Sequence, residues 1–206
     1  MTRHVSRHRW ARTTLVLAAV VAAVITAWAE WPSPARVERI SATGRADDTT
    51  TTARVVVHAG RSDFAWRMAR AVASGLAEGG MHTAVATTAS PAATPQATDR
   101  VVVLVAPTYW WAPAWPVMRA TARMRLAREV PVLPIVTASG QGERALGLLR
   151  TRAVRSGGTV LDGLALYRLR PNSEAAERGA DNTVAAESLA HAAGRQLAQR
   201  VHARAP

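Results

Sequence analysis

The chain has 206 residues, 49% of them apolar, which is enough for one domain with a buried core and a short additional segment. It contains no cysteine, which excludes disulfide bonds, thiolate nucleophiles and cysteine-ligated metal centres. The net charge is +12, and all 26 basic residues are arginine. The absence of lysine excludes mechanisms that need a Schiff-base or phosphate-loop lysine. Because the arginines form no dense block, we expect no nucleic-acid partner.

The first 29 residues have the pattern of a segment that enters the export machinery. Residues 1–12 carry four arginines and no acid, and residues 13–29 carry no charge. A positive flank before an apolar run holds the N-terminus in the cytoplasm. The pattern therefore predicts an N-terminal apolar helix, either as a transmembrane signal-anchor or as a signal peptide.

Two interpretations of this helix remain open. Tryptophans flank the uncharged run at positions 10, 28 and 31, which favours a retained single-pass membrane anchor with the domain outside. The small-x-small sequence Ala27-Trp28-Ala29 favours cleavage near Ala29, which predicts a secreted or periplasmic protein. As a helix the run spans about 26 Å, slightly less than the hydrocarbon thickness of a bilayer.

A linker is predicted at residues 30–53. This stretch is rich in Pro, Ser, Thr and Asp and has no amphipathic period, which is typical of a flexible tether. The globular domain is therefore predicted at residues 54–206.

Strand-like and helical segments alternate through this domain. Apolar or β-branched runs predict five strands, at 55–57, 82–87, 101–106, 130–136 and 159–169. Amphipathic runs predict four helices, at 62–77, 117–128, 142–155 and 183–201. Strands that alternate with helices of this length predict an α/β fold, with a five-stranded parallel sheet covered by helices on both faces.

Three local features refine these elements. Pro131 and Pro134 predict an edge-like start to the fourth strand, because proline cannot donate to a sheet ladder. The fifth strand is predicted to be interrupted at Asp162-Gly163. The apolar residues expected to face inward from the last helix are Val184, Leu189, Leu197 and Val201.

The stretch PTYWWAPAWP, residues 107–116, holds four of the ten aromatic rings of the chain. Its three prolines predict a stiffened loop that leaves the end of the third strand. Ligands of parallel sheets bind outside the carboxyl ends of the strands, near the switch in strand order. Three loops are expected there, at residues 58–64, 107–116 and 137–142. The rings could stack on a ligand, pack on the following helix or touch a membrane surface.

Together these strands and loops resemble the flavodoxin-like family over residues 54–204. The resemblance implies that an FMN is bound non-covalently, with electron transfer or NAD(P)H-dependent reduction as the activity. It also implies which residues lie at the flavin ring: Pro107, Thr108, Tyr109, Trp110 and Trp111 in the aromatic loop, and Thr137, Ser139 and Gly140 in the next loop.

The loop expected to hold the FMN phosphate departs from the family pattern, which is Ser/Thr-x-Thr-Gly-Asn-Thr. The candidates for phosphate contacts at this position are His58, Gly60, Arg61 and Ser62. Asp63 would be a good helix N-cap, but its carboxylate competes with a phosphate for the same amides. Two hypotheses remain open: the loop is retuned around Arg61, or it has lost FMN.

The leading hypothesis is a membrane-tethered or exported FMN-binding protein. Its expected partners are a flavin, a nicotinamide or a redox protein, and the membrane, which it contacts through residues 13–29. Whether it is an FMN-dependent oxidoreductase stays open. The flavin carries the chemistry in such proteins, so no catalytic residue and no metal ligand is predicted. The alternative is a flavin-free flavodoxin-like binding or scaffold module at the membrane.

Overall fold

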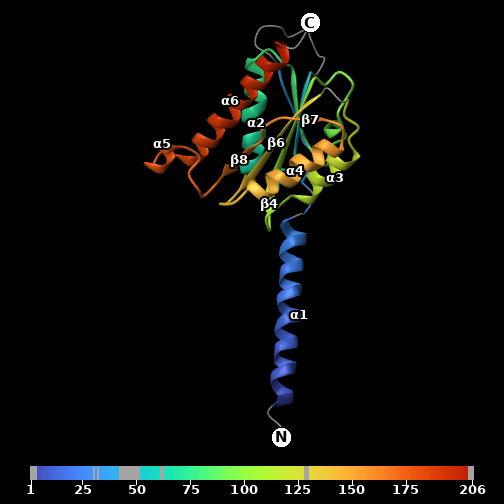
Figure 1. Ribbon diagram of the computed structural model, residues 1–206, viewed down its shortest axis with the longest axis vertical. Helices are drawn as coiled ribbons and strands as arrows, with labels where there is room; N and C mark the ends of the chain where they lie inside the picture. The colour runs from blue at the N-terminus through green and yellow to red at the C-terminus, as the bar shows by residue number, and fades with distance from the viewer. Residues whose placement is uncertain are drawn as a thin grey trace. The chain divides into compact units, whose positions relative to one another are not determined.

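The computed structural model describes residues 4–29, 31, 33–41, 52–60, 63–127 and 130–203 of the chain (Figure 1). The chain divides into two compact units, Met1–Trp31 and Pro32–Pro206. The described part of the first unit forms helix α1 (His4–Ala29). The sheet and the other helices belong to the second unit, so the candidate site lies within that unit.

Helix α1 does not have the character predicted for the N-terminal segment. Among the described residues, no helix is both long enough and apolar enough to cross a membrane. The predicted single-pass membrane location, with residues 13–29 as the transmembrane segment, is therefore wrong. Helix α1 has 26 residues, but its uncharged part, residues 13–29, extends only about 26 Å as a helix, less than the roughly 30 Å of bilayer hydrocarbon.

The second unit is built on one mixed sheet. Its described strands are β1 (Val37–Ile40), β2 (Ala53–Val57), β3 (Thr83–Thr87), β4 (Val101–Tyr109), β5 (Ala112–Pro113), β6 (Pro131–Ala138), β7 (Thr159–Val160) and β8 (Leu164–Tyr167). Its described helices are α2 (Asp63–Glu78), the short 3₁₀ helix η1 (Pro91–Ala93), α3 (Trp115–Arg123), α4 (Glu143–Arg155), α5 (Glu174–Glu177) and α6 (Asn182–His202).

The order of the main strands confirms the predicted α/β class. Strands β3, β2, β4, β6 and β8 are neighbours in that order and pair in parallel. This is the 2-1-3-4-5 order of flavodoxin-like sheets, in which the order reverses between the first and third strands. Here that switch point lies between β2 and β4.

The sheet has eight described strands rather than the predicted five. Two of the additional strands pair antiparallel, β1 with β3 and β5 with β4. Strand β1 comes from residues predicted as a linker, and it pairs Val37 with Ala86 and Ile40 with Thr83. Residues 42–51 of that predicted linker lie outside the described residues.

The third additional strand exists because the last predicted strand is divided in two. Strands β7 and β8 both pair with β6 and are separated by residues 161–163, which confirms the predicted interruption. A Cβ at Gly163 would lie 2.5 Å from the Pro134 carbonyl oxygen, so only glycine fits there. Pro134 also lacks the N–H that a ladder would need. However, β6 pairs on both sides and is buried throughout, so its predicted edge-like start is wrong.

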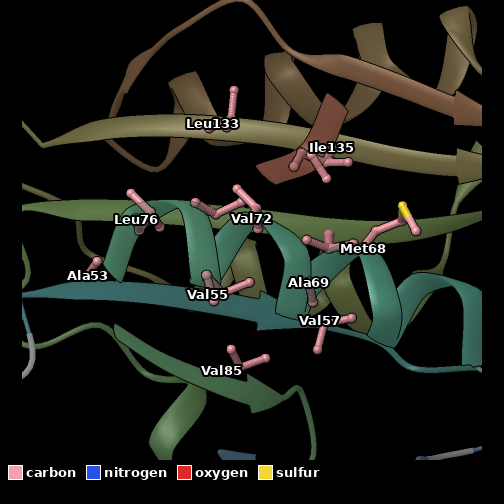
Figure 2. Packing of buried hydrophobic residues seen from close by; sticks show 14 of the residues in the cluster. Ala53, Val55, Val57, Met68, Ala69, Val72, Leu76, Val85, Leu133 and Ile135 are labelled. Carbon is pink, nitrogen blue, oxygen red and sulfur yellow. The ribbon is translucent and has the colours of Figure 1, made fainter. Parts of the chain in front are cut away.

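Helices cover both faces of the sheet, with α2 and α6 side by side on one face and α3 and α4 on the other (Figure 1). Successive residues of β2 alternate between these layers: Val55 and Val57 belong to the α2/α6 core, and Val56 belongs to the α3/α4 core. Figure 2 shows Leu76, Val72 and Met68 of α2 in one cluster with Val55 and Val57 of β2. Burial on both faces explains why the central strands are continuous apolar runs in the sequence.

Helices α2 and α6 approach each other through small residues. A Cβ at Gly194 would lie 2.1 Å from the Val72 carbonyl oxygen, and one at Gly75 would lie 2.0 Å from the His191 carbonyl oxygen. This close approach selects the buried face of α6: Ala186, Ala190, Gly194, Leu197, Ala198 and Val201. The predicted inward positions of Leu197 and Val201 are confirmed, but those of Val184 and Leu189 are wrong, since both side chains are exposed.

Candidate functional site

The candidate site lies at the carboxyl ends of β2, β4 and β6, next to the switch point. Val57 is in register with Val105, and Pro107 is in register with Thr137, so the three strands end near one another. The loops that follow them are those in which the sequence predicted flavin contacts. Ligands of doubly wound sheets bind at this edge.

The aromatic stretch is a tight hairpin rather than a loop. Strand β4 continues to Tyr109, and Ala112 returns beside it as the first residue of β5. The two central residues of the turn, Trp110 and Trp111, have positive φ values of 48° and 65°. Two-residue hairpin turns of this kind usually contain Asn-Gly, because a left-handed conformation costs a residue with a Cβ about 1–2 kcal/mol. The hairpin therefore holds two large rings at positions where small residues are the rule.

Both rings of the turn face solvent. The exposed fractions of Trp110 and Trp111 are 57% and 56%, and their ring centroids lie 6.5 Å apart in a tilted arrangement. Trp115, at the start of α3, is also exposed. Flat apolar faces that are exposed at a ligand-binding edge are suited to stacking on a flat ligand.

A shallow groove of about 380 Å³ runs beside these rings. Its lining residues are Thr108, Trp110, Trp111, Ala138, Ser139, Gly140 and Gln141. The Thr108 hydroxyl is buried at this wall and has no hydrogen-bond partner among the described residues. At Gly140, which also lines the groove, an added Cβ would meet no heavy atom within 4 Å, so there is open space at this residue. The groove thus combines apolar faces with hydroxyl groups.

The loop after β2 contacts the aromatic hairpin rather than the groove. Gly60 has a φ of +60°, and a Cβ there would lie 2.6 Å from the Tyr109 hydroxyl oxygen. Tyr109 therefore packs on the loop that was predicted to bind phosphate, which explains why its ring does not line the groove. Arg61 and Ser62, the other predicted phosphate contacts in this loop, lie outside the described residues.

Ser33 contacts polar groups of the same loop through its hydroxyl. The Gly60 amide donates a hydrogen bond to the Ser33 hydroxyl oxygen (3.2 Å), and the same oxygen lies 3.3 Å from His58 Nδ1. His58 is fully buried and Ser33 is 5% exposed. The His58 imidazole, a predicted phosphate contact, therefore faces Ser33 in the interior.

The segment around Ser33 is fixed to the sheet by further contacts. The Thr87 hydroxyl donates to the Pro34 carbonyl oxygen and accepts from the Arg36 amide, both at 2.9 Å. The Arg36 guanidinium lies 4.0 Å from the centroid of the Trp66 ring on α2. We call residues 33–36 the strap. Its position follows from β1, which begins at Val37 and continues into the sheet.

A polar cluster lies next to the groove, at the start of α4. The Tyr167 hydroxyl donates to Glu143 Oε1 (2.5 Å), and Glu143 Oε2 accepts from the Gly142 amide (3.1 Å). Burial, and then the bond to Glu143, raise the pKa of Tyr167 to about 12. The bond from Tyr167 lowers the pKa of Glu143. Arg170 stacks on Tyr167 and pairs with Glu143 (3.5 Å).

The structure therefore divides the predicted flavin contacts into two groups. Five of them line the groove together: Thr108, Trp110, Trp111, Ser139 and Gly140. The others in the described residues do not line it, because Pro107 and Thr137 are buried strand residues, His58 is buried under the strap, and Gly60 and Tyr109 contact each other. Ala138 and Gln141 also line the groove; neither was named singly as a flavin contact, but both lie within the loop predicted at residues 137–142 to border the flavin.

Ser33 was missed by the sequence reasoning for a different reason. It lies 27 residues before the glycine that it contacts, in a stretch with the composition of a linker. No local motif marks it. Only the pairing of β1 with β3 brings it to this edge of the sheet.

Comparison with known proteins identifies the fold. No family model matches the chain, and no curated protein matches it. Solved structures do match, at 14–17% sequence identity. The chain is similar to a flavodoxin from the domain Archaea, with a TM-score of 0.56 at 15% identity, over 73% of this chain and 99% of that one.

Two further structures are similar. A WrbA-like flavodoxin from Agrobacterium tumefaciens has a TM-score of 0.53 at 17% identity, over 75% of this chain and 99% of that one. The Flv1 flavodiiron core from Synechocystis sp. PCC6803 has a TM-score of 0.56 at 14% identity, over 76% of this chain. The match spans only 38% of that flavodiiron chain. The domain therefore has a flavodoxin-like fold.

Proposed function

We propose that this domain, which has the flavodoxin-like fold, binds the ring system of a flavin in the groove beside Trp110 and Trp111 and acts in electron transfer or NAD(P)H-dependent reduction. The single observation that carries the proposal is the hairpin turn. It holds two exposed tryptophans in left-handed conformations at the ligand-binding edge of the sheet. Strained positions of this kind concentrate at ligand-binding sites.

The fit of a flavin to these residues differs between its two ends. The ring end fits, because Trp110 and Trp111 offer flat faces, and the Thr108 hydroxyl is a buried polar group without a partner among the described residues. Ser139 offers a further hydroxyl among the residues that line the groove. At the described residues the phosphate end of FMN fits poorly, because the Gly60 amide already donates to Ser33. FMN is therefore supported at its ring alone.

The residues of the groove would act by binding and positioning. A bound flavin supplies the electron- or hydride-transfer chemistry. The tryptophan rings would stack on the flavin and shield one face from water, and the hydroxyls would hydrogen-bond to its polar edge. This division of roles requires no acid, base or nucleophile from the chain.

The test compares two tryptophans of the same stretch. The full-length protein is titrated with FMN, and binding is followed by flavin fluorescence and by visible absorbance. We expect Trp110→Ala to weaken binding about tenfold or more, since stacking of a flat heterocycle on an aromatic side chain contributes about 1–3 kcal/mol. Trp115→Ala is the matched control, because Trp115 is equally exposed but does not line the groove.

Equal effects of the two substitutions would contradict the stacking role of Trp110. Failure of the wild-type protein to bind any flavin at micromolar concentrations would refute the proposed function. That result would favour the alternative function, a flavin-free binding module.

A further inference from the structure

Among the described residues of the loop before α2, the chain itself occupies a backbone donor that a phosphate would use. In a doubly wound sheet the phosphate of a bound nucleotide lies at the N-terminus of the helix that follows the first strand, here α2. The loop before α2 offers the Gly60 amide as a donor, but this amide is bonded to the Ser33 hydroxyl. A ligand phosphate would have to displace Ser33 to reach it.

Displacement of Ser33 is opposed by the rest of the strap. Residues 33–36 are held by both hydrogen bonds to Thr87 and by the stacking of Arg36 on Trp66. Strand β1 then adds a four-residue pairing with β3. Ser33 is therefore a fixed part of the domain, and its hydroxyl holds the Gly60 amide.

Among the described residues at this end, the charge of Asp63 disfavours a phosphate. Asp63 is the first residue of α2 and is exposed, so its carboxylate lies where the helix dipole would otherwise attract an anion. Arg67, one turn further along α2, donates to Glu187 at 2.6 Å. His58 is fully buried against Ser33. A phosphate dianion near the start of α2 would be repelled by the Asp63 carboxylate.

We infer that the strap and Asp63 make the site indifferent to phosphate, so that it takes a flavin by its ring alone and binds riboflavin as well as FMN. The inference rests on the proposed function, because it concerns the same groove. It narrows the expected ligand to a flat heterocycle that needs no phosphate group for binding. Two residues, Ser33 and Asp63, then determine the specificity.

The test is a pair of titrations of the full-length protein, one with riboflavin and one with FMN. We expect the two dissociation constants to agree within about threefold, since the phosphate forms no net favourable contact. Asp63→Asn should tighten FMN binding several-fold by removing a like charge, and it should leave riboflavin binding unchanged. Ser33→Ala should shift the ratio in the same direction, because it frees the Gly60 amide.

The outcomes separate this inference from the proposed function. Wild-type protein that binds FMN at least ten times more tightly than riboflavin overturns the inference and leaves the proposed function intact. Equal dissociation constants that neither substitution changes also overturn it, because the strap and Asp63 are then not the cause. Binding of neither flavin refutes the proposed function, and the inference with it.

Discussion

The close packing of α2 on α6 predicts opposite effects for two glycine-to-alanine substitutions. Gly194→Ala places a methyl group 2.1 Å from the Val72 carbonyl oxygen and 3.0 Å from the Leu76 amide nitrogen. Both atoms belong to the backbone of α2, so they cannot move aside as the end of a flexible side chain could. The two helices must separate, or the backbone must distort.

The magnitude follows from two opposing terms. Overpacking of a close contact costs about 1–3 kcal/mol, and a rigid backbone partner places this site at the upper end of that range. Replacing glycine by alanine inside a helix stabilises the folded state by about 1 kcal/mol through helix propensity. We therefore expect Gly194→Ala to lower the free energy of unfolding by about 2 kcal/mol, which lowers Tm by about 4–8 °C in a domain of this size.

Gly147→Ala in α4 is the matched control. An alanine Cβ there meets no heavy atom within 4 Å, so only the propensity term remains. We expect this variant to gain up to about 1 kcal/mol and to melt slightly above the wild-type protein. Thermal and urea unfolding followed by circular dichroism measure both variants. A Gly194→Ala protein as stable as the Gly147→Ala protein would show that α2 and α6 are not in backbone contact.

Two further predictions concern polar contacts in the domain. Asp99→Ala should lower the free energy of unfolding by about 3–5 kcal/mol. The reason is that the Asp99 carboxylate accepts two hydrogen bonds from the buried guanidinium of Arg54 in β2, which the substitution leaves unpaired with any carboxylate. A loss below about 1 kcal/mol in urea unfolding would contradict this prediction. The pKa of Tyr167 is raised from 10.0 to about 12, so the folded state holds its proton more tightly and the interaction stabilises the fold below pH 10 but is lost as the pH rises from 10 to 12. The stability difference between wild-type and Tyr167→Phe proteins should therefore shrink over that interval, and a difference independent of pH would refute the assignment.

The sequence predicted the central parallel strands correctly because they are buried on both faces. Val55–Val57 and the run from Val101 onwards contact a helical layer on either side, and such burial leaves an apolar run that is visible without any other information. Strand β1 carries no such signal. Its residues alternate between exposed and half-buried, and two of the four are charged, which is also the composition of a linker.

The candidate site was predicted in part for similar reasons. Chain order alone brings the loops after β4 and β6 together, so the groove residues Thr108 and Ser139 could be inferred from strand order. The turn at Trp110 and Trp111 could not, because positive φ values are signalled by glycine or asparagine rather than tryptophan.

The face of α6 was predicted wrongly because large apolar residues were taken as the inward set. Val184 and Leu189 fit a helical period, but the partner helix carries Gly75 at the crossing point. Backbones that approach this closely leave room only for small side chains, such as Ala190 and Gly194. The size of the facing residues decided the buried face, and that depends on which helices become neighbours.

Strand β1 also protects the sheet from other chains. It covers the outer side of β3, whose sequence TAVAT is uncharged and rich in residues that favour strands. An exposed strand of this kind would offer free backbone groups to a second molecule. In β1 itself, Glu38 bonds to Arg70 and Arg39 stands beside it, and charged side chains on an outer strand discourage further pairing. Residues 37–40 thus occupy the backbone groups along the outer side of β3, and we expect a chain that began at residue 54 to leave them free for a second molecule.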